Sequence, residues 1–213
     1  MKELTNKIYE ELFERYPALN VCRAEIMGAY ECALATYLEK GTVFCCGNGG
    51  SSSDSEHIVG ELLKSFKLRR AIDEDVAAAL QAYGEDGAYL CEKLEGSLAA
   101  VSLISQTGVL TAYANDRAWD AAMAQQLYGL GRKGDCLFAL STSGNSKNCV
   151  LAVMVAKAKG LKTVGFTGVK GGRMKELCDV CIAVPEMETY KVQELHLPVY
   201  HCICAMLEME IFG

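Results

Sequence analysis

The sequence predicts an α/β fold: one domain in which a five-stranded parallel sheet is flanked by helices, giving three α/β/α layers in a flavodoxin-like arrangement. Short apolar runs alternate with helical patterns, which is typical of a parallel sheet covered on both faces. Of the 213 residues, 51% are hydrophobic and 23% are charged, which is enough apolar material for one core. We therefore expect a single domain over 1–213, with N-terminal helices at 1–40 and an α/β core at 41–213.

Two packing helices are expected before the sheet, over residues 3–39. Apolar side chains recur there at helical spacing, and Pro17 separates the two patterns.

Five apolar runs rich in β-forming residues are the expected strands, with helical patterns in the gaps between them. The helices are expected at about 52–66, 118–131, 145–159 and 190–211, and Gly160 ends the third. The strands are expected at Thr42–Cys46, Leu98–Leu103, Cys136–Leu140, Lys162–Thr167 and Val180–Val184.

The stretch from Ala71 to Gly96 is acidic and rich in alanine. We expect one or two helices there, interrupted at Gly84–Gly87. Because the stretch lies between two strands, it is predicted to be an extra helical excursion from the sheet at about 71–96.

Charge and hydropathy exclude several function classes. The net charge of −6 is spread along the chain, and no basic cluster exceeds the short group of Lys67, Arg69 and Arg70, so no nucleic-acid partner is expected. No apolar run approaches the roughly 20 residues of a membrane span, and 1–16 is too charged for a signal peptide. We expect a cytoplasmic protein without a membrane partner.

The eleven cysteines are predicted to be buried free thiols. Their number is odd, and most lie inside apolar runs. Cys178 and Cys181 have CxxC spacing, but they straddle a helix end and a strand start and no second pair accompanies them. We do not expect a metal or redox site there.

Two strand–loop–helix units share one chemistry: GNGGSSSD at 47–54 and STSGNS at 141–146. Glycines let the backbone approach a ligand, while N–H groups and hydroxyls converge as they do in phosphate sites. Helix capping by Ser51–Asp54 and by Ser143–Asn145 is the alternative for either loop alone. Two such loops at one sheet edge favour ligand binding. Neither loop fits the Walker A or GxGxxG pattern, so a sugar phosphate is favoured over a nucleotide.

The three histidines fall in two polar segments. His57 and Glu61 stand at i and i+4 of one helix, and His196 and His201 lie near Gln193 and Glu194 in the last helix. Each segment taken alone is better explained by solvated or hydrogen-bonded polar residues.

Together the two segments offer nitrogen and oxygen ligands for a divalent metal such as zinc: His57, Glu61, Gln193 and His201. Gln193 and His201 would lie about 12 Å apart along a helix that Pro198 is expected to bend. Their side chains would have to lean together, or the ligands would come from different subunits.

The sequence resembles the sugar isomerase (SIS) domain family, and within it the bacterial phosphoheptose isomerases. The matching motifs cover most of the chain after residue 40: GNGGSSSDSEHIVGEL at 47–62, AND at 114–116, STSGNS at 141–146, GFTGVKGG at 165–172 and VQELHLPVYH at 192–201.

The resemblance implies conversion of sedoheptulose 7-phosphate to D-glycero-D-manno-heptose 7-phosphate through an enediolate, by a homotetramer with active sites at subunit interfaces. It implies zinc on His57, Glu61, Gln193 and His201, with Glu61 and His201 as the catalytic acid/base pair. The implied substrate-binding residues are Asn48, Gly49, Gly50, Ser51, Glu61, Asn115, Asp116, Ser141, Thr142, Ser143, Ser146 and Gln193.

Two alternatives stay open on sequence alone. A branch of the same family is a non-enzymatic adaptor that binds a replication initiator and lacks the final histidine, which is present here as His201. An isomerase of another phosphosugar is the second alternative, with the 71–96 excursion setting specificity.

Overall fold

A five-stranded parallel sheet forms the centre of the molecule, in the order β2-β1-β3-β4-β5. The computed structural model describes all 213 residues. Register is set on both sides of β1, where Val43 pairs with Ala100 of β2 and with Cys136 of β3. All five strands lie within a residue or two of their expected positions: β1 Val43–Cys46, β2 Ala100–Ser102, β3 Cys136–Leu140, β4 Lys162–Gly168 and β5 Val180–Val184.

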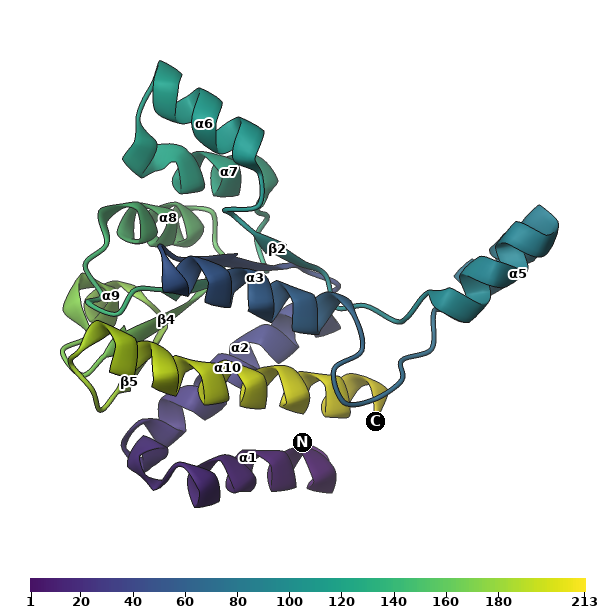
Figure 1. The fold of residues 1–213 in the computed structure, drawn as a ribbon, viewed down its shortest axis with the longest axis horizontal. Helices are drawn as coiled ribbons and strands as arrows, with labels where there is room; N and C mark the ends of the chain where they lie inside the picture. The colour runs from purple at the N-terminus through teal and green to yellow at the C-terminus, as the bar shows by residue number, and fades with distance from the viewer.

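Helices cover both faces of the sheet and produce the predicted three layers (Figure 1). Alternate side chains of β3 enter two cores: Phe138 packs with α1, α2, α3 and α10 on one face, and Leu137 packs with α7, α8 and α9 on the other. These helices are α1 Glu3–Arg15, α2 Arg23–Leu38, α3 Gly50–Leu63, α7 Ala122–Leu130, α8 Lys147–Ala158, α9 Gly172–Leu177 and α10 Thr189–Phe212.

The helices differ from expectation in the second half of the chain. The helix expected at 118–131 is a 3-10 turn, Trp119–Ala121, followed by α7. α6, Thr107–Asp116, was not predicted, and the six-residue α9 was expected only as a helix end before Cys178, without a range. The glycines at Gly108, Gly171 and Gly172 mask both from a propensity argument, because glycine is a poor helix former.

The 71–96 excursion is a helical arm that leaves the body of the molecule (Figure 1). It consists of α4 Glu74–Leu80, a 3-10 turn Gln81–Tyr83 and α5 Gly84–Lys93. Gly84 has φ 62°, so the predicted interruption is present where the chain turns into α5. No residue of α4 is buried, and Gly87 is the only buried residue of α5.

The last helix, α10, is long and apolar enough to span a membrane by length and composition alone. It packs instead into the core on the α2 and α3 side, where Val192, Val199 and Ile203 are fully buried. It runs as one continuous helix through Pro198.

All eleven cysteines are free thiols, as expected, and seven are buried. Cys178 follows the last residue of α9, and Cys181 lies in β5, so the CxxC segment does straddle a helix end and a strand start.

Candidate active site

The two polar loops meet where the strand order reverses. The loop after β1 leads into α3 on one face, while the loop after β3 leads into α8 on the other, so β1 and β3 flank the topological switch point of the sheet. The amides of Asn48 and Asn148 exchange two hydrogen bonds of 2.9 and 2.8 Å across this point. Open α/β sheets bind their ligands here.

The first loop depends on glycine at two positions. Gly49 takes φ 55° directly before α3. A Cβ on Gly47 would lie 2.3 Å from the Ser51 carbonyl oxygen, whereas one on Gly50 would displace only the flexible end of Gln193, 2.7 Å away. Gln193 donates to the buried Ser51 hydroxyl at 3.5 Å, which joins the loop to α10.

The second loop is a tight turn closed by serines. Ser141 Oγ donates to Ser146 Oγ at 2.9 Å, and the Gly144 N–H donates to the Ser141 carbonyl at 2.8 Å. Gly144 has φ 66°, and its carbonyl accepts from Met174 N at 3.1 Å, so the loop rests on α9.

The capping alternative does not describe either helix start. The position before α3 is Gly49, and the position before α8 is Ser146, and neither makes a side-chain capping bond. Ser51 to Ser53 lie inside the first turn of α3 rather than before it. The residue before each helix therefore leaves the helix start uncapped, although the N–H groups of Ser52 and Ser53 donate to the Gly49 carbonyl and that of Cys149 donates to Asn148 Oδ1.

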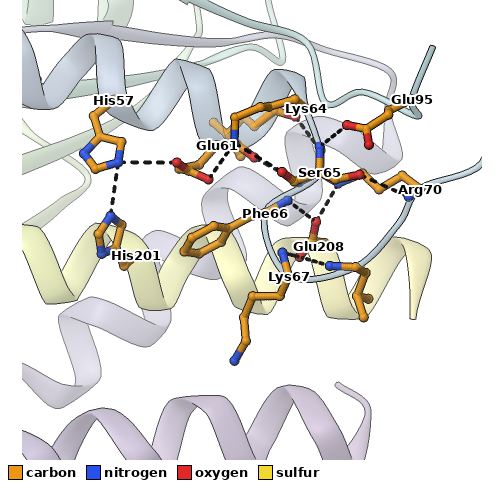
Figure 2. Close-up of polar contacts among 12 residues, drawn as sticks. His57, Glu61, Lys64, Ser65, Phe66, Lys67, Arg70, Glu95, His201 and Glu208 are labelled. Atoms are coloured by element: carbon orange, nitrogen blue, oxygen red, sulfur yellow. Dashed lines mark hydrogen bonds and ion pairs between the residues drawn. The ribbon is translucent and has the colours of Figure 1, made fainter. Parts of the chain in front are cut away.

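Three of the four predicted metal ligands contact one another. His57 Nε2 lies 3.3 Å from Glu61 Oε1 and 3.4 Å from His201 Nε2, so His57 on α3 stands between the carboxylate and the α10 histidine (Figure 2). Glu61 is 9% exposed, and His201 is half-buried. A carboxylate and two imidazoles at these separations can share a cation or pass a proton.

Tyr200 and Asp54 orient the His57 ring. Tyr200 OH donates to Asp54 Oδ1 at 3.2 Å and lies 3.0 Å from His57 Nδ1. Because the phenol proton goes to Asp54, the phenol oxygen accepts from Nδ1–H of His57. That tautomer leaves a lone pair on Nε2, toward Glu61 and His201.

Burial outweighs the nearby Glu61 carboxylate, which raises the pKa of His201. Burial, together with the nearby His57, lowers the pKa of His201, so His201 is neutral and able to accept a proton at neutral pH. Lys64 donates to Glu61 Oε2 at 3.4 Å from the solvent side.

The donor set fits a divalent metal in part. Donor atoms of a tetrahedral zinc shell with bonds of about 2.0–2.1 Å lie about 3.3–3.4 Å apart, which matches both contacts of His57. The contacts run pairwise through His57, however, and no three His, Cys, Asp or Glu side chains converge on one position. Gln193 contacts Ser51 instead, so the separation expected along α10 is present.

Some of the other predicted site residues lie in the two loops, and others lie on α6. Thr142 and Ser143 belong to the second loop with Ser141 and Ser146. Asn115 and Asp116 end α6, are exposed, and make a 2.9 Å hydrogen bond only with each other. The structure does not join them to the other site residues.

Sequence reasoning missed four polar residues of this region: Asp54, Lys64, Asn148 and Tyr200. Asp54, His57 and Glu61 recur at helical spacing on α3, and that periodicity could have revealed Asp54. Nothing in the local sequence indicates that Tyr200, 143 residues later, contacts His57.

His196 is not part of the cluster of His57, Glu61 and His201. It is fully buried, its Nε2 lies 3.3 Å from the Thr167 carbonyl oxygen, and its Nδ1 has no partner. Burial lowers the pKa of His196 to about 4.

The His196 pKa predicts a loss of stability in acid. The folded pKa of about 4 lies below the ordinary 6.5, so its contribution is complete above pH 6.5 and is lost as the pH falls toward 4. Between about pH 7 and about pH 5, we expect wild type to lose about 2 kcal/mol of unfolding free energy beyond the loss in His196→Gln. Urea denaturation at both pH values measures it, and equal losses in the two proteins would contradict it.

Comparison with known proteins gives consistent results. A SIS domain family model matches residues 18–168. A phosphoheptose isomerase of Akkermansia muciniphila is 40% identical over 171 residues, which span 80% of this chain and 77% of that protein. A phosphoheptose isomerase of Burkholderia pseudomallei is 37% identical over 190 residues, spanning 89% of this chain and 84% of that protein.

The fold has a solved counterpart of similar length. The structure of the phosphoheptose isomerase GmhA from Neisseria gonorrhoeae superposes with a TM-score of 0.72 at 29% identity, covering 96% of this chain and 98% of the other. The SIS match ends at residue 168, so Gln193 and His201 lie beyond it. The superposition on GmhA, which covers 96% of this chain, extends beyond residue 168 into α10.

Proposed function

Because the chain belongs to the SIS domain family, and within it to the phosphoheptose isomerases, we propose that it converts sedoheptulose 7-phosphate to D-glycero-D-manno-heptose 7-phosphate. The observation that carries the proposal is the contact of Glu61 and His201 with His57, beside a switch point lined by two phosphate-type loops. A binding adaptor would need the loops but has no use for an acid/base pair.

The proposed reaction moves one proton between adjacent sugar carbons. Glu61 takes the proton from the carbon next to the carbonyl and returns it to the neighbouring carbon, with an enediolate between the two steps. His201 moves the proton between the two sugar oxygens, and its lowered pKa means that the ring enters the reaction in its neutral form. Burial of Glu61 keeps bulk water from the reacting carbons.

The loops hold the substrate in this scheme. Ser141, Thr142, Ser143 and Ser146 bind the phosphate around the turn at Gly144, and Asn48, Gly49, Gly50 and Ser51 approach the sugar from β1. Gln193 closes this side through its bond to Ser51. Asn115 and Asp116 reach the sugar only if α6 or a neighbouring subunit brings them to it.

Zinc is the proposed cofactor. His57, Glu61 and His201 would hold it, and their donor separations support this assignment. Gln193 is the proposed fourth ligand. When bound, zinc would polarise the substrate oxygens and stabilise negative charge that develops on them.

The proposed reaction predicts loss of turnover in two variants. Glu61→Gln and His201→Ala should each lower kcat by about 10²- to 10⁴-fold, the usual contribution of a general acid or base. Conversion of sedoheptulose 7-phosphate by zinc-loaded protein measures it, with bound zinc determined for every variant.

Tyr128→Ala, on the exposed face of α7, is the control and should match wild type. A wild-type protein that binds sedoheptulose 7-phosphate without turning it over would support the adaptor. Turnover of a different phosphosugar alone would shift the proposal to that substrate.

Phosphate binding by the second loop predicts a defect in Gly144→Ala. The new Cβ would lie 1.9 Å from the Gly171 carbonyl oxygen at a residue with φ 66°, so the turn must open. We expect KM to rise at least about 10-fold, because the phosphate donors are no longer preorganised. Gly129→Ala, in α7 with open space around its Cβ, is the matched control. Equal KM values for the two variants would contradict phosphate binding at this loop.

The proposed assembly is a homotetramer with active sites at subunit interfaces. The arm supports it, because α4 and α5 are shorter than the roughly 12–15 residues that an isolated helix needs. The arm also exposes large side chains, with Tyr83 of the 3-10 turn 72% exposed and Tyr89 of α5 60% exposed. A groove of about 370 Å³ between α1 and α10, with His201 in its lining, supports a subunit boundary beside the site. The proposed location is the cytoplasm.

An arm that packs on a second copy predicts weaker assembly when its apolar side chains are removed. Tyr83→Ser combined with Tyr89→Ser should move the tetramer toward smaller species in light scattering coupled to size-exclusion chromatography, since apolar contact area drives association. Tyr128→Ser, 64% exposed on α7, is the matched control. An unchanged mass for the arm variant would place the interface elsewhere.

A further inference from the structure

One buried carboxylate accepts several hydrogen bonds from the loop that follows α3. Glu208 of α10 accepts from the backbone N–H groups of Phe66, Lys67 and Leu68 at 2.8, 2.7 and 3.1 Å, and from Arg70 Nε at 2.8 Å (Figure 2). Burial alone would raise the pKa of Glu208, but the backbone bonds and the Arg70 guanidinium lower it, so Glu208 is a carboxylate.

Arg70 extends this contact to the backbone of the proposed catalytic base. Its Nη2 donates to the carbonyl oxygen of Glu61 at 2.9 Å, and its Nη1 donates to that of Leu62 at 2.6 Å. These carbonyls belong to the last turn of α3, which has no intrahelical partner for them. Both charged side chains are buried, with 0% of Arg70 and 1% of Glu208 exposed.

The pair thereby links the two helices that carry the acid/base pair. Glu61 is in the last turns of α3, where its carbonyl accepts from Arg70. His201 lies two turns before Glu208 on α10, about 10 Å along the axis. The hydrogen bonds from the Arg70 side chain to the carbonyls of Glu61 and Leu62 fix the position of Glu61 relative to α10. The bond from Arg70 to Glu208 supplies that link, because Glu208 is on the same helix as His201. A loop that only needed a stable end would not require a guanidinium on the carbonyl of Glu61 itself.

We propose that Arg70 and Glu208 are positioning residues that hold Glu61 in place relative to His57 and His201. The proposal rests on the proposed isomerase function for its kinetic consequence, but its structural consequence stands apart from turnover.

Arg70→Lys is the test variant, because an ammonium keeps the charge but cannot reach Glu208 and both carbonyls as the planar fork does. We expect kcat to fall about 10- to 100-fold with little change in KM, as misplacement of a catalytic group does. Glu208→Gln, which keeps the size and one acceptor, is the second variant if Arg70→Lys does not fold, with the same expected result.

Asp135→Asn is the matched control. Asp135 is also a buried side chain that accepts hydrogen bonds from loop N–H groups, those of Thr42 at 2.8 Å and Arg132 at 2.7 Å, but it precedes the amino end of β3, away from the carboxyl ends where the site lies. It should lower thermal stability without changing kcat below the melting range.

Histidine ¹H–¹⁵N spectra give a readout that needs no turnover, because the chain has only three histidines. Signals of His57 and His201 should shift in Arg70→Lys, while His196, buried against Thr167, should keep its position and report an intact fold. In Asp135→Asn all three should stay.

A kcat equal to that of the control, with unshifted His57 and His201 signals, would overturn the proposal. If wild type does not isomerise the substrate, the proposed function fails, and the spectra alone then decide: shifted His57 and His201 support positioning, and unshifted signals overturn it.

Discussion

The packing of α10 along α3 is the constraint on which the site depends. Contacts advance together along the two helices: Gln193 meets Ser51, His201 meets His57, and Glu208 meets the loop after α3. The two helices are therefore parallel, and residues later in α10 contact residues later in α3 or in the loop that follows it. A line of polar contacts follows from this register: first Gln193 with the loop after β1, then His57 with Glu61 and His201, and last the buried pair Arg70 and Glu208.

This line of polar contacts places costly polar groups in an apolar layer. Tyr200 and Arg70 are among the largest fully buried side chains, and Asp54 Oδ2 has no hydrogen-bond partner. Burial raises the pKa of Asp54, which is the sign of a carboxylate held against its solvation preference. Such groups add little to stability by comparison with apolar residues, because desolvation offsets their attraction. Their presence is better explained by the geometry that they impose on His57 and Glu61.

Sequence reasoning succeeded where local pattern determines structure. The five strands were predicted because short apolar β-forming runs alternate with helical patterns, and two of these runs lead into the polar loops that the strand order places at one switch point. It failed at α6 and gave no range for α9, where glycine obscured short helices. It also treated Lys67, Arg69 and Arg70 as one basic group, although Arg70 is buried on Glu208, 138 residues away, and Lys67 and Arg69 are exposed.

The two halves of the candidate site differ in the sequence separation of the residues that hold them together. The phosphate-type loop is held mainly by short-range contacts, such as Ser141 with Ser146 and Gly144 with Ser141, so a short motif both encodes and reveals it. In the other half, a short motif reveals the pair His57 and Glu61, but the contacts that join this pair and Arg70 to α10 link residues more than 130 positions apart. Changes in α10 that keep the loop motifs can therefore remove the chemistry while leaving the binding fold in place. That separation gives a physical route by which one domain can serve both as an isomerase and as a binding module.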